Sequence, residues 1–328
     1  MQGELPVVSV ILVAYHGDAW LSACVESLAE ASRERLHLVL VDNGGNTVLD
    51  QLDLSRFDVE HLRTPRPMGF AEANNFALVH ANKLTDYIVF LNQDVINGDG
   101  WIDSCLACFT SFSNQLLGAL SPTIRTYDGS GWDPAFLTCL RGAKVDPDDI
   151  SPSNERLIVL REVPAPALIV RRDVLLRAGP FDPIFGSYYE DYDLCRRVRA
   201  LGYGVGFCSD ATVRHYSGST TTDHKKELRR MRLILRNRTI HKLRSAEKGR
   251  LRLLLRWFLL DVPRRVVRAM LRRPGSQPVP VIFSASWDLV ALSWRLLNPR
   301  RDVRRWQDYL SSIGWDTSVV VEEEVLQA

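Results

Sequence analysis

Residues 7–14 read Val-Val-Ser-Val-Ile-Leu-Val-Ala, an apolar and β-branched run of strand length. Such a run predicts a strand that is buried on both faces. Further patterns alternate along the chain over residues 18–31 (helix), 36–41 (strand), 59–62 (strand), 70–83 (helix) and 87–91 (strand). This alternation predicts an α/β domain with a mostly parallel sheet and right-handed crossovers.

Polar residues follow three of these predicted strands. Tyr15 and His16 follow the first strand, Asp42 begins the turn after the second, and Asn92-Gln93-Asp94 follows the strand over 87–91. In parallel α/β sheets, ligands bind beyond the carboxyl ends of the strands. We therefore expect these side chains to converge on one rim of the sheet.

Residues 189–197 read Tyr-Glu-Asp-Tyr-Asp-Leu-Cys-Arg-Arg and hold three carboxylates, Glu190, Asp191 and Asp193, within four positions. Like charges this close cost free energy unless a metal, a cationic partner or a proton in transit uses them. The alternative is acidic capping of a helix that begins near Leu194. The acidic positions at strand ends elsewhere in the chain favour a functional site.

The second half of the chain has a less regular pattern. Residues 121–160 are rich in Pro, Gly, Asp and Ser and predict loops with short strands. The later patterns predict a strand over 167–170, a helix over 173–178, a helix over 194–201 and a strand over 203–207. His215 follows this last strand in the predicted arrangement.

Composition is that of a globular protein, with 46% apolar and 24% charged residues in 328. The length predicts one large domain plus an appendage. The six cysteines show no disulfide framework and no signal peptide is visible, so we expect a cytoplasmic location. Cys105 and Cys108 form a CxxC pair in a helical pattern, for which core packing is favoured over metal binding.

Charge divides the chain in two. Residues 225–328 hold 23 Lys and Arg against 10 Asp and Glu, a net charge of +13. The whole chain holds 41 and 39, so residues 1–224 carry a net charge of −11. Regions of opposite charge usually have different partners, and this split predicts a domain boundary near residue 224.

The basic region contains two amphipathic patterns. The first lies over 250–273, with Pro263 expected to kink the helix, and the second over 283–297 contains Trp287 and Trp294. Neither reaches the ~20 uncharged apolar residues that span a bilayer. Arg-rich helices with Trp indicate contact with an anionic membrane surface. The alternative is a helical appendage packed on the first domain; nucleic-acid binding is disfavoured because no binding module accompanies the charge.

Seven motifs occur in order: Val-Ser-Val-Ile-Leu-Val-Ala-Tyr (8–15), Val-Asp-Asn-Gly (41–44), Met-Gly-Phe-Ala-Glu-Ala-Asn-Asn (68–75), Phe-Leu-Asn-Gln-Asp (90–94), Gly-Pro-Phe-Asp (179–182), Tyr-Glu-Asp-Tyr-Asp-Leu-Cys-Arg-Arg (189–197) and Val-Arg-His (213–215). In this order they resemble the inverting family 2 glycosyltransferases with a GT-A fold, especially bacterial rhamnosyltransferase-like members. The resemblance covers two-thirds of the chain.

The resemblance implies a donor site. Asp42 would accept hydrogen bonds from the pyrimidine ring of the nucleotide; the alternative is an ordinary turn aspartate. Asn92 and Asp94 occupy the place of the family's Asp-x-Asp motif, which binds a divalent cation on the donor diphosphate. Asn92 departs from that motif, so Asp94 would carry the coordination of Mg²⁺ or Mn²⁺. His215 resembles an additional metal ligand, with a structural histidine as the alternative.

The resemblance also implies the acceptor side. Asp191 would be the general base, and Glu190 would raise its pKa or orient the acceptor hydroxyl. Asp193 would cap the following helix. Tyr188 and Tyr189 would stack on a sugar or pack in the core.

Three further residues would support the donor. Tyr15 lies on the predicted rim, Gly69 would allow close backbone approach, and Asn74 would line the helix beneath the donor.

Together these inferences predict an inverting glycosyltransferase. It would move a sugar such as L-rhamnose from a dTDP- or UDP-sugar to a glycan or polyprenyl-diphosphate-linked acceptor in bacterial surface polysaccharide synthesis. We expect a peripheral position on the cytoplasmic face of the inner membrane and no nucleic-acid partner. The alternative is a catalytically silent sugar-nucleotide-binding scaffold of the same fold, which the departure at Asn92 favours.

Overall fold

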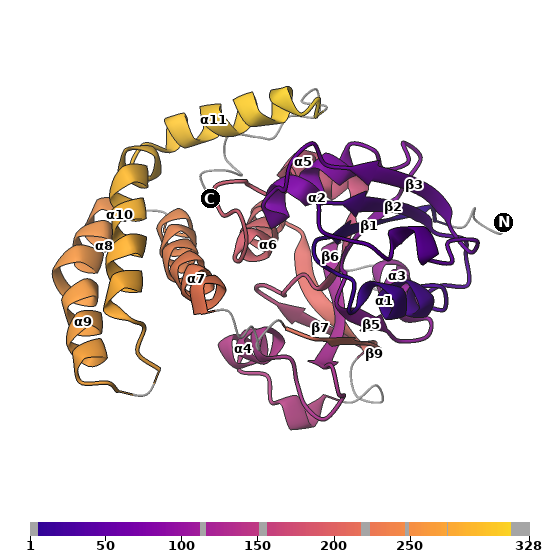
Figure 1. Ribbon diagram of the computed structural model, residues 1–328, viewed down its shortest axis with the longest axis horizontal. Helices are drawn as coiled ribbons and strands as arrows, with labels where there is room; N and C mark the ends of the chain where they lie inside the picture. The colour runs from indigo at the N-terminus through magenta and orange to yellow at the C-terminus, as the bar shows by residue number, and fades with distance from the viewer. Residues whose placement is uncertain are drawn as a thin grey trace.

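A computed structural model describes residues 6–111, 116–150, 156–217, 224–246, 249–273 and 275–315. Within these residues the chain forms one nine-stranded sheet with helices packed on it, and a further group of helices beside it (Figure 1). The strands are β1 (Val8–Ala14), β2 (His37–Asp42), β3 (Asp58–Arg63), β4 (Tyr87–Asn92), β5 (Val95–Asn97), β6 (Leu117–Thr126), β7 (Leu157–Leu160), β8 (Ala167–Arg171) and β9 (Gly204–His215).

The sheet confirms the predicted α/β class. Its order is β3-β2-β1-β4-β8-β6-β9-β5, with β7 paired to β9. The first four strands in this order are parallel neighbours, and β6 and β9 run in the same direction as these four. Only β8, β5 and β7 run the other way among the described strands. The mostly parallel sheet that the sequence predicts is therefore present.

The core lies where the apolar strands are covered on both faces. Val10, Ile11 and Leu12 of β1 are fully buried, as are residues 38–41 of β2. The helices that pack on the sheet or at its edge are α1 (Leu21–Leu28), α2 (Phe70–Leu78), α3 (Trp101–Ser111), α4 (Pro134–Ala143), α5 (Arg172–Ala178) and α6 (Glu190–Ala200). Burial on both faces explains the apolar runs at the centres of these two strands.

The region over 121–160 is more regular than the sequence predicts. It contains most of β6, the helix α4, a 3₁₀ turn (Pro147–Asp149) and β7, while residues 151–155 lie outside the described residues. Asp133 caps α4, because its side chain accepts hydrogen bonds from the backbone N–H groups of Ala135 and Phe136 at 2.8 and 3.0 Å. Pro134 follows directly, so this cap signal was readable in the sequence.

Two predicted boundaries are wrong near the acidic motif. Helix α6 begins at Glu190 rather than near Leu194, after Tyr189 in a left-handed conformation with φ 74°. Strand β9 continues to His215 rather than ending near Phe207, because its register with β6 shifts between Cys208 and Thr212. This irregularity places polar residues inside the strand and obscures the strand pattern in the sequence.

The C-terminal helices are α7 (His224–Arg244), α8 (Arg250–Arg256), a π-helical turn η3 (Trp257–Asp261), α9 (Val262–Met270), α10 (Val279–Leu296) and α11 (Pro299–Ser312). Figure 1 shows α7 between the sheet domain and the layer formed by α8, α9 and α10, while α11 reaches back toward α5. The π-helical turn directly precedes Pro263, as expected for a proline that removes a backbone donor. None of the described helices is long and apolar enough to cross a membrane.

Candidate active site

The predicted rim is present at the carboxyl edge of the sheet. Ala14 at the end of β1 pairs with Asp42, and Val13 pairs with Asn92 at the end of β4. On the other half of the sheet, β9 ends at His215, which pairs with Val95 just after Asp94. Parallel strands end on the same edge, so residues that lie far apart in the sequence meet there.

Gln93 joins the ends of β1 and β4. Its side-chain amide accepts a hydrogen bond from the Tyr15 backbone N–H at 2.7 Å and donates one to the Tyr15 carbonyl at 2.9 Å. A Cβ atom at Gly17 would lie 2.2 Å from Oε1 of Gln93, so a larger residue there would displace the Gln93 side chain from Tyr15. The Tyr15 ring is 47% exposed and contacts His16 edge-on. The rim thus presents an aromatic ring held by a fixed backbone.

Asp42 is buried and its carboxylate is fully hydrogen-bonded. Oδ1 accepts from Gly44 N–H at 2.9 Å and from the Asn46 amide at 2.8 Å, and Oδ2 accepts from Arg63 Nε at 3.0 Å. Burial acts to raise the pKa of Asp42, but these hydrogen bonds and the charge of Arg63 lower it. The Arg63 side chain is 80% exposed, so the Oδ2 partner lies on the open side of the rim. The sequence reasoning missed Arg63.

The motif over 68–75 has a packing role in this structure. Gly69 faces the backbone of Gly186, whose carbonyl would lie 3.3 Å from an added Cβ. Asn74 is buried and donates to the Phe70 carbonyl at 2.9 Å. Asn75 is fully buried and exchanges hydrogen bonds with the backbone of Phe181. The close backbone approach expected at Gly69 is therefore an approach to the 179–189 segment.

His215 lies between two carboxylates. Its Nε2 is 3.4 Å from Oδ1 of Asp94, and its Nδ1 is 3.0 Å from Oδ2 of Asp133. Burial acts to lower the pKa of His215, but the two carboxylates raise it to about 9. The same Asp133 oxygen accepts a hydrogen bond from Ser217. Asp133 was not anticipated as a site residue, although its position before Pro134 marked it as a helix cap.

These residues fit a divalent cation shared with a phosphate ligand. Asp94 and His215 supply one oxygen and one nitrogen within 3.4 Å of each other. The Oδ1 atom of Asn92 beside them is buried and has no hydrogen-bond partner. Among the described residues no group of three or more His, Cys, Asp or Glu is arranged to hold a metal. An Mg²⁺ or Mn²⁺ ion at Asp94 and His215 would take its remaining ligands from water and phosphate oxygens, as Mg²⁺ usually does.

Glu190, which is buried, and Asp191, which is half-buried, form an acidic pair at the start of α6. Asp191 accepts backbone hydrogen bonds from Ala165 at 3.1 Å and from Tyr192 at 2.8 Å. Burial raises the pKa of Asp191 to about 6, although these hydrogen bonds act in the opposite direction. Burial and the charge of Asp191 raise the pKa of Glu190, whose Oε2 has no hydrogen-bond partner. A carboxyl group with a pKa near 6 is suited to accept a proton at neutral pH.

Asp193 does not cap the helix, contrary to the prediction. It lies fully buried inside the first turn of α6, with its oxygens 3.1 Å from Arg196 Nη2 and 2.9 Å from Arg197 Nε. Arg197 in turn donates to the carbonyls of Gly179 and Pro180 at 2.7 and 2.8 Å. Burial acts to raise the pKa of Asp193, but the nearby guanidinium groups hold it well below its ordinary value. Asp193 therefore fixes the Gly-Pro-Phe-Asp turn against α6.

Helix α7 holds the loop that leads into the acidic pair. The Asn237 amide nitrogen lies 2.7–2.8 Å from the carbonyl oxygens of Phe185, Ser187 and Tyr188. Tyr188 and Tyr189 have φ angles of 71° and 74°, a conformation that costs free energy for residues other than glycine. The basic C-terminal region is therefore part of the support of the site, which the sequence reasoning did not anticipate.

The CxxC pair is buried in the core, as favoured. Cys105 and Cys108 lie on α3, and Cys208 of β9 approaches Cys108 with 3.3 Å between the sulfur atoms. Burial is the leading cause of the raised pKa of Cys105. All six cysteines are free.

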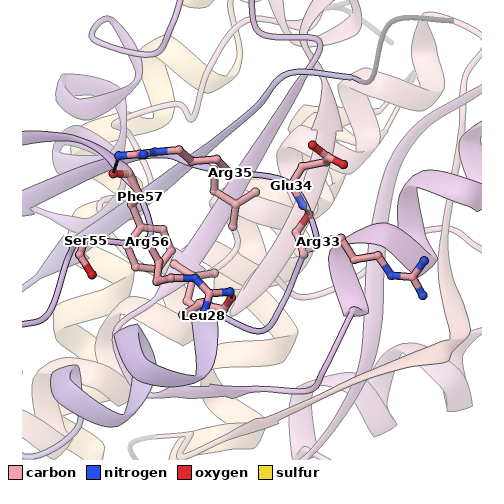
Figure 2. Close-up of a pocket in the computed structure, with 10 residues that line it drawn as sticks. Leu28, Arg33, Glu34, Arg35, Ser55, Arg56 and Phe57 are labelled. Carbon is pink, nitrogen blue, oxygen red and sulfur yellow. Dashed lines mark hydrogen bonds between the residues drawn. The ribbon is translucent and has the colours of Figure 1, made fainter. Parts of the chain in front are cut away.

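A separate pocket of about 240 Å³ lies at the opposite edge of the sheet, beside the amino ends of β2 and β3. Figure 2 shows that Arg33 points away from Arg35 and Arg56. Arg35 donates to the Phe57 carbonyl at 2.7 Å, and Arg56 lies 3.6 Å from Glu30. Because its cations do not converge, this pocket is not part of the site described above.

The sequence profile of a family described as "Glycosyltransferase like family 2" matches residues 6–232. The chain is 27% identical over 242 residues to the N-acetylglucosaminyl-diphospho-decaprenol L-rhamnosyltransferase of Mycobacterium tuberculosis, covering 66% of this chain and 78% of that protein.

Two solved structures share the fold. The mannosyltransferase PcManGT of Pyrobaculum calidifontis, in complex with GDP-Man and Mn²⁺, has a TM-score of 0.55 at 15% identity and covers 98% of this chain and 85% of its own. TarS 1–349 of S. aureus, in complex with UDP-GlcNAc, has a TM-score of 0.53 at 17% identity and covers 98% and 92%.

Proposed function

The chain belongs to glycosyltransferase family 2, and we propose that it transfers L-rhamnose from a dTDP- or UDP-sugar to a lipid-linked glycan with inversion at the anomeric carbon. The acceptor we propose is a polyprenyl-diphosphate-linked sugar of the kind named for the mycobacterial relative. The observation that carries this proposal is the half-buried Asp191 carboxyl group, with its pKa near 6. It accepts from the Ala165 N–H, and the neighbouring Pro166 carbonyl accepts from Asn92 at the end of β4.

In the proposed mechanism the chain binds the donor on the β1–β2–β4 side of the rim. Asp42 accepts from the pyrimidine ring and Tyr15 lies against the nucleotide, while Gly69 and Asn74 support the donor through the packing of α2. Asp94 and His215 would hold Mg²⁺ or Mn²⁺ beside Asn92. When bound, the cation neutralises the charge that develops on the leaving nucleoside diphosphate.

The acceptor hydroxyl then attacks the anomeric carbon from the face opposite the diphosphate. Asp191 takes the hydroxyl proton as the new glycosidic oxygen–carbon bond forms and the carbon–oxygen bond to the diphosphate breaks. Glu190, whose pKa is raised further from its ordinary value by burial and the neighbouring charge, orients the hydroxyl in its protonated form. Inversion follows because there is a single displacement.

We propose a peripheral position at an anionic membrane surface on its cytoplasmic side. On α10 the residues spaced along one face, Phe283, Trp287, Val290 and Trp294, are exposed, and Trp287 is 73% exposed. On α9, Met270 is 72% exposed beside the arginines of this region. This exposed apolar face with a basic surround supports membrane contact, and the opposite face of α10 packs with α7 and Phe185 at the same time.

The experiment that tests the catalytic proposal is a thermal-shift panel of UDP, dTDP, GDP, CDP and NAD, each with and without Mn²⁺, followed by transfer assays with the matching sugar nucleotide. We expect Mn²⁺-dependent stabilisation by one pyrimidine diphosphate, because a ligand at 100 times its Kd adds about 2.7 kcal/mol. Asp94→Asn should lose this stabilisation, and the exposed Asp149→Asn should keep it.

The silent-scaffold alternative differs in one outcome. It predicts the nucleotide-dependent shift without any transfer or donor hydrolysis, since Asn92 replaces the first acidic residue of the motif. Absence of a shift with every nucleotide would contradict both candidates.

A further inference from the structure

A second pocket, of about 550 Å³, lies between α4, α6 and α7. Its lining is dominated by charged side chains of α6, α7 and the segment after β7. The charged and titratable residues of this lining are Arg161, Glu162, Arg196, Arg199, His241 and Lys242. The pocket is separate from the donor rim at the ends of β1, β2 and β4.

Three nitrogen atoms of residues that line this pocket are buried without a hydrogen-bond partner. Nη1 of Arg196 and Nε of Arg199 are donors, and Nδ1 of His241 donates only when the ring carries a proton there. Arg196 is only 5% exposed, so water cannot easily satisfy its free N–H group. Buried polar groups are nearly always paired in folded proteins. Several unpaired donors around one cavity therefore indicate a missing acceptor.

The positive charge of the pocket exceeds what its surroundings neutralise. Asp193 pairs with Arg196, which leaves Arg161, Arg199 and Lys242 opposite Glu162; Glu162 lies 3.4 Å from His241, a residue that is charged only when protonated. The C-terminal turns of α4, α6 and α7 also face this region, and each contributes roughly −0.5 charge. Together with Glu162, these ends leave an excess of about half a positive charge.

The crowding of cations also affects the pKa values of two of them. Burial, together with the charge of Arg161, lowers the pKa of Arg199. Burial, together with the charge of Arg238, lowers the pKa of Lys242. An anion in the pocket would relieve this repulsion and accept the free N–H groups.

The pocket is adjacent to the proposed base. Arg196 and Arg199 follow Asp191 on α6 by five and eight residues, which corresponds to about 7.5 and 12 Å along the helix axis. Glu162 lines the pocket, and its charge contributes to the raised pKa of Asp191, for which burial is the largest cause. One or two monosaccharide units between a hydroxyl at Asp191 and an anion in the pocket would span this distance.

We propose that this pocket binds the diphosphate group of the lipid-linked acceptor, with Arg199, Lys242 and the free Nη1 of Arg196 as its donors. This inference rests on the proposed function for the identity of the acceptor. The pocket would fix the sugar next to the diphosphate with its hydroxyl toward Asp191. Acceptors that lack the diphosphate would bind more weakly.

The first test is direct binding of inorganic pyrophosphate to the full chain by calorimetry in EDTA, where the donor site has no metal. We expect Arg199→Gln/Lys242→Gln to raise the Kd at least about tenfold, because each loses a charge-assisted hydrogen bond. Arg33→Gln, in the pocket of Figure 2, is the matched control and should leave the Kd unchanged.

Three outcomes would overturn the proposal: no binding by the unmodified protein, an unchanged Kd in Arg199→Gln/Lys242→Gln, or loss of binding in Asp94→Asn alone. The last would assign the pyrophosphate to the donor site. A drop in thermal stability without a change in Kd would mean that the cations only complement the helix ends.

The second test is kinetic and separates the two proposals. With a polyprenyl-diphosphate-linked acceptor, Arg199→Gln/Lys242→Gln should raise the acceptor KM at least about tenfold and leave the donor KM unchanged. With a neutral alkyl glycoside of the same sugar, the variant and the unmodified protein should have equal KM values. If the variant and the unmodified protein have equal acceptor KM values with both acceptors, the pocket does not bind the diphosphate. The glycosyltransferase proposal would be unaffected by that result. The calorimetric test does not depend on sugar transfer. It therefore still shows whether the pocket binds pyrophosphate if the protein transfers no sugar.

Discussion

At the scale of single residues, Glu190 and Asp191 are neighbours that differ in exposure and in their hydrogen-bond partners. Asp191 accepts two backbone hydrogen bonds, whereas Oε2 of Glu190 has none. Hydrogen bonds to a carboxylate favour its charged form, so Asp191 is the member of the pair that ionises first as pH rises. The two carboxyl groups can therefore divide the work, with one as base and the other as hydrogen-bond donor.

Asp191→Asn should lower kcat by about 10²–10⁴-fold, because the asparagine cannot accept the hydroxyl proton. Binding of the nucleoside diphosphate should be unchanged, since Asp191 lies on the acceptor side. Single-turnover transfer and the nucleotide thermal shift measure the two effects. The exposed Asp149→Asn is the control, and retained turnover in Asp191→Asn would exclude it as the base.

The pH dependence should follow the raised pKa of Asp191. We expect kcat/KM to fall as pH drops below about 6, where the base is protonated. Stability should show the opposite sign: the folded state binds this proton more tightly than the unfolded state, so stabilisation is lost as pH rises through about 6. Asp191→Asn should therefore gain about 1–3 kcal/mol relative to the unmodified protein at pH 8 and little at pH 4. An equal gain in the free energy of unfolding at pH 4 and pH 8 would contradict the raised pKa of Asp191.

Asp133 should set the affinity for the proposed metal without contacting it. Its Oδ2 lies 3.0 Å from Nδ1 of His215, which fixes the ring with Nε2 toward Asp94. Removing such an outer partner typically weakens metal binding by about 10–100-fold. Asp133→Asn should show this loss in Mn²⁺ titrations followed by electron paramagnetic resonance. The exposed Asp128→Asn should leave the Mn²⁺ affinity unchanged. Equal Mn²⁺ affinities of Asp133→Asn and the unmodified protein would contradict the positioning role of Asp133.

At the scale of secondary-structure elements, α7 decides the conformation of the loop before α6. Asn237 and Arg236 contact the carbonyl groups of residues 184–188, and Arg244 lies 2.7 Å from Asp182. These contacts hold two consecutive tyrosines at positive φ, a conformation that the loop would not keep on its own. An element that the charge pattern assigned to the appendage thus shapes the acidic pair.

Asn237→Ala should destabilise the chain by about 1–3 kcal/mol, because it leaves buried carbonyl groups without a donor. We also expect kcat to fall more than the affinity for the nucleoside diphosphate, since Asn237 holds Tyr188 next to the acidic pair, whereas α2 contacts the loop through Gly186. Chemical denaturation and turnover measure these effects. Glu227→Ala, on the same helix with a surface ion pair to Arg230, is the control. Unchanged turnover in Asn237→Ala would show that the loop holds without α7.

At the scale of the whole molecule, the C-terminal helices have two faces. Leu235, Ile240, Ile282 and Leu289 form a core with Phe185 of the loop before α6. The opposite face of α10 is apolar and exposed. Truncation at residue 224 would remove both, so loss of membrane binding in such a fragment would not separate a membrane role from misfolding. Substitutions confined to the exposed face of α10 distinguish a membrane role from misfolding.

Replacing Phe283, Trp287 and Trp294 together by Ser should abolish most binding to vesicles of anionic phospholipid. Each aromatic side chain contributes about 1.5–3 kcal/mol when fully buried in an apolar phase. Thermal stability should change little, because these side chains are not in the core. Vesicle co-sedimentation at two salt concentrations measures the effect, with Val159→Ser on β7 as an exposed apolar control. Unchanged sedimentation would contradict the membrane proposal.

Much of the fold could be predicted from the sequence, because strands buried on both faces need uninterrupted apolar runs. The runs over 7–14 and 36–41 therefore predicted β1 and β2 closely. The same reasoning placed Tyr15, Asp42 and Asn92 on one rim, since parallel strands end on one side. The register shift in β9 and the start of α6 were missed, because both depend on backbone conformations that distant contacts impose.

What the sequence alone determined is the α/β class, the motif order and which residue types face the rim. Local patterns carry this information, because periodicity and strand ends are properties of short segments. Only the tertiary structure decided that Asp193 is bound by arginines, that Asp133 holds His215 and that α7 supports the loop before Asp191. These contacts join residues up to 82 positions apart, and their energies arise from burial and pairing that exist only once the chain is folded.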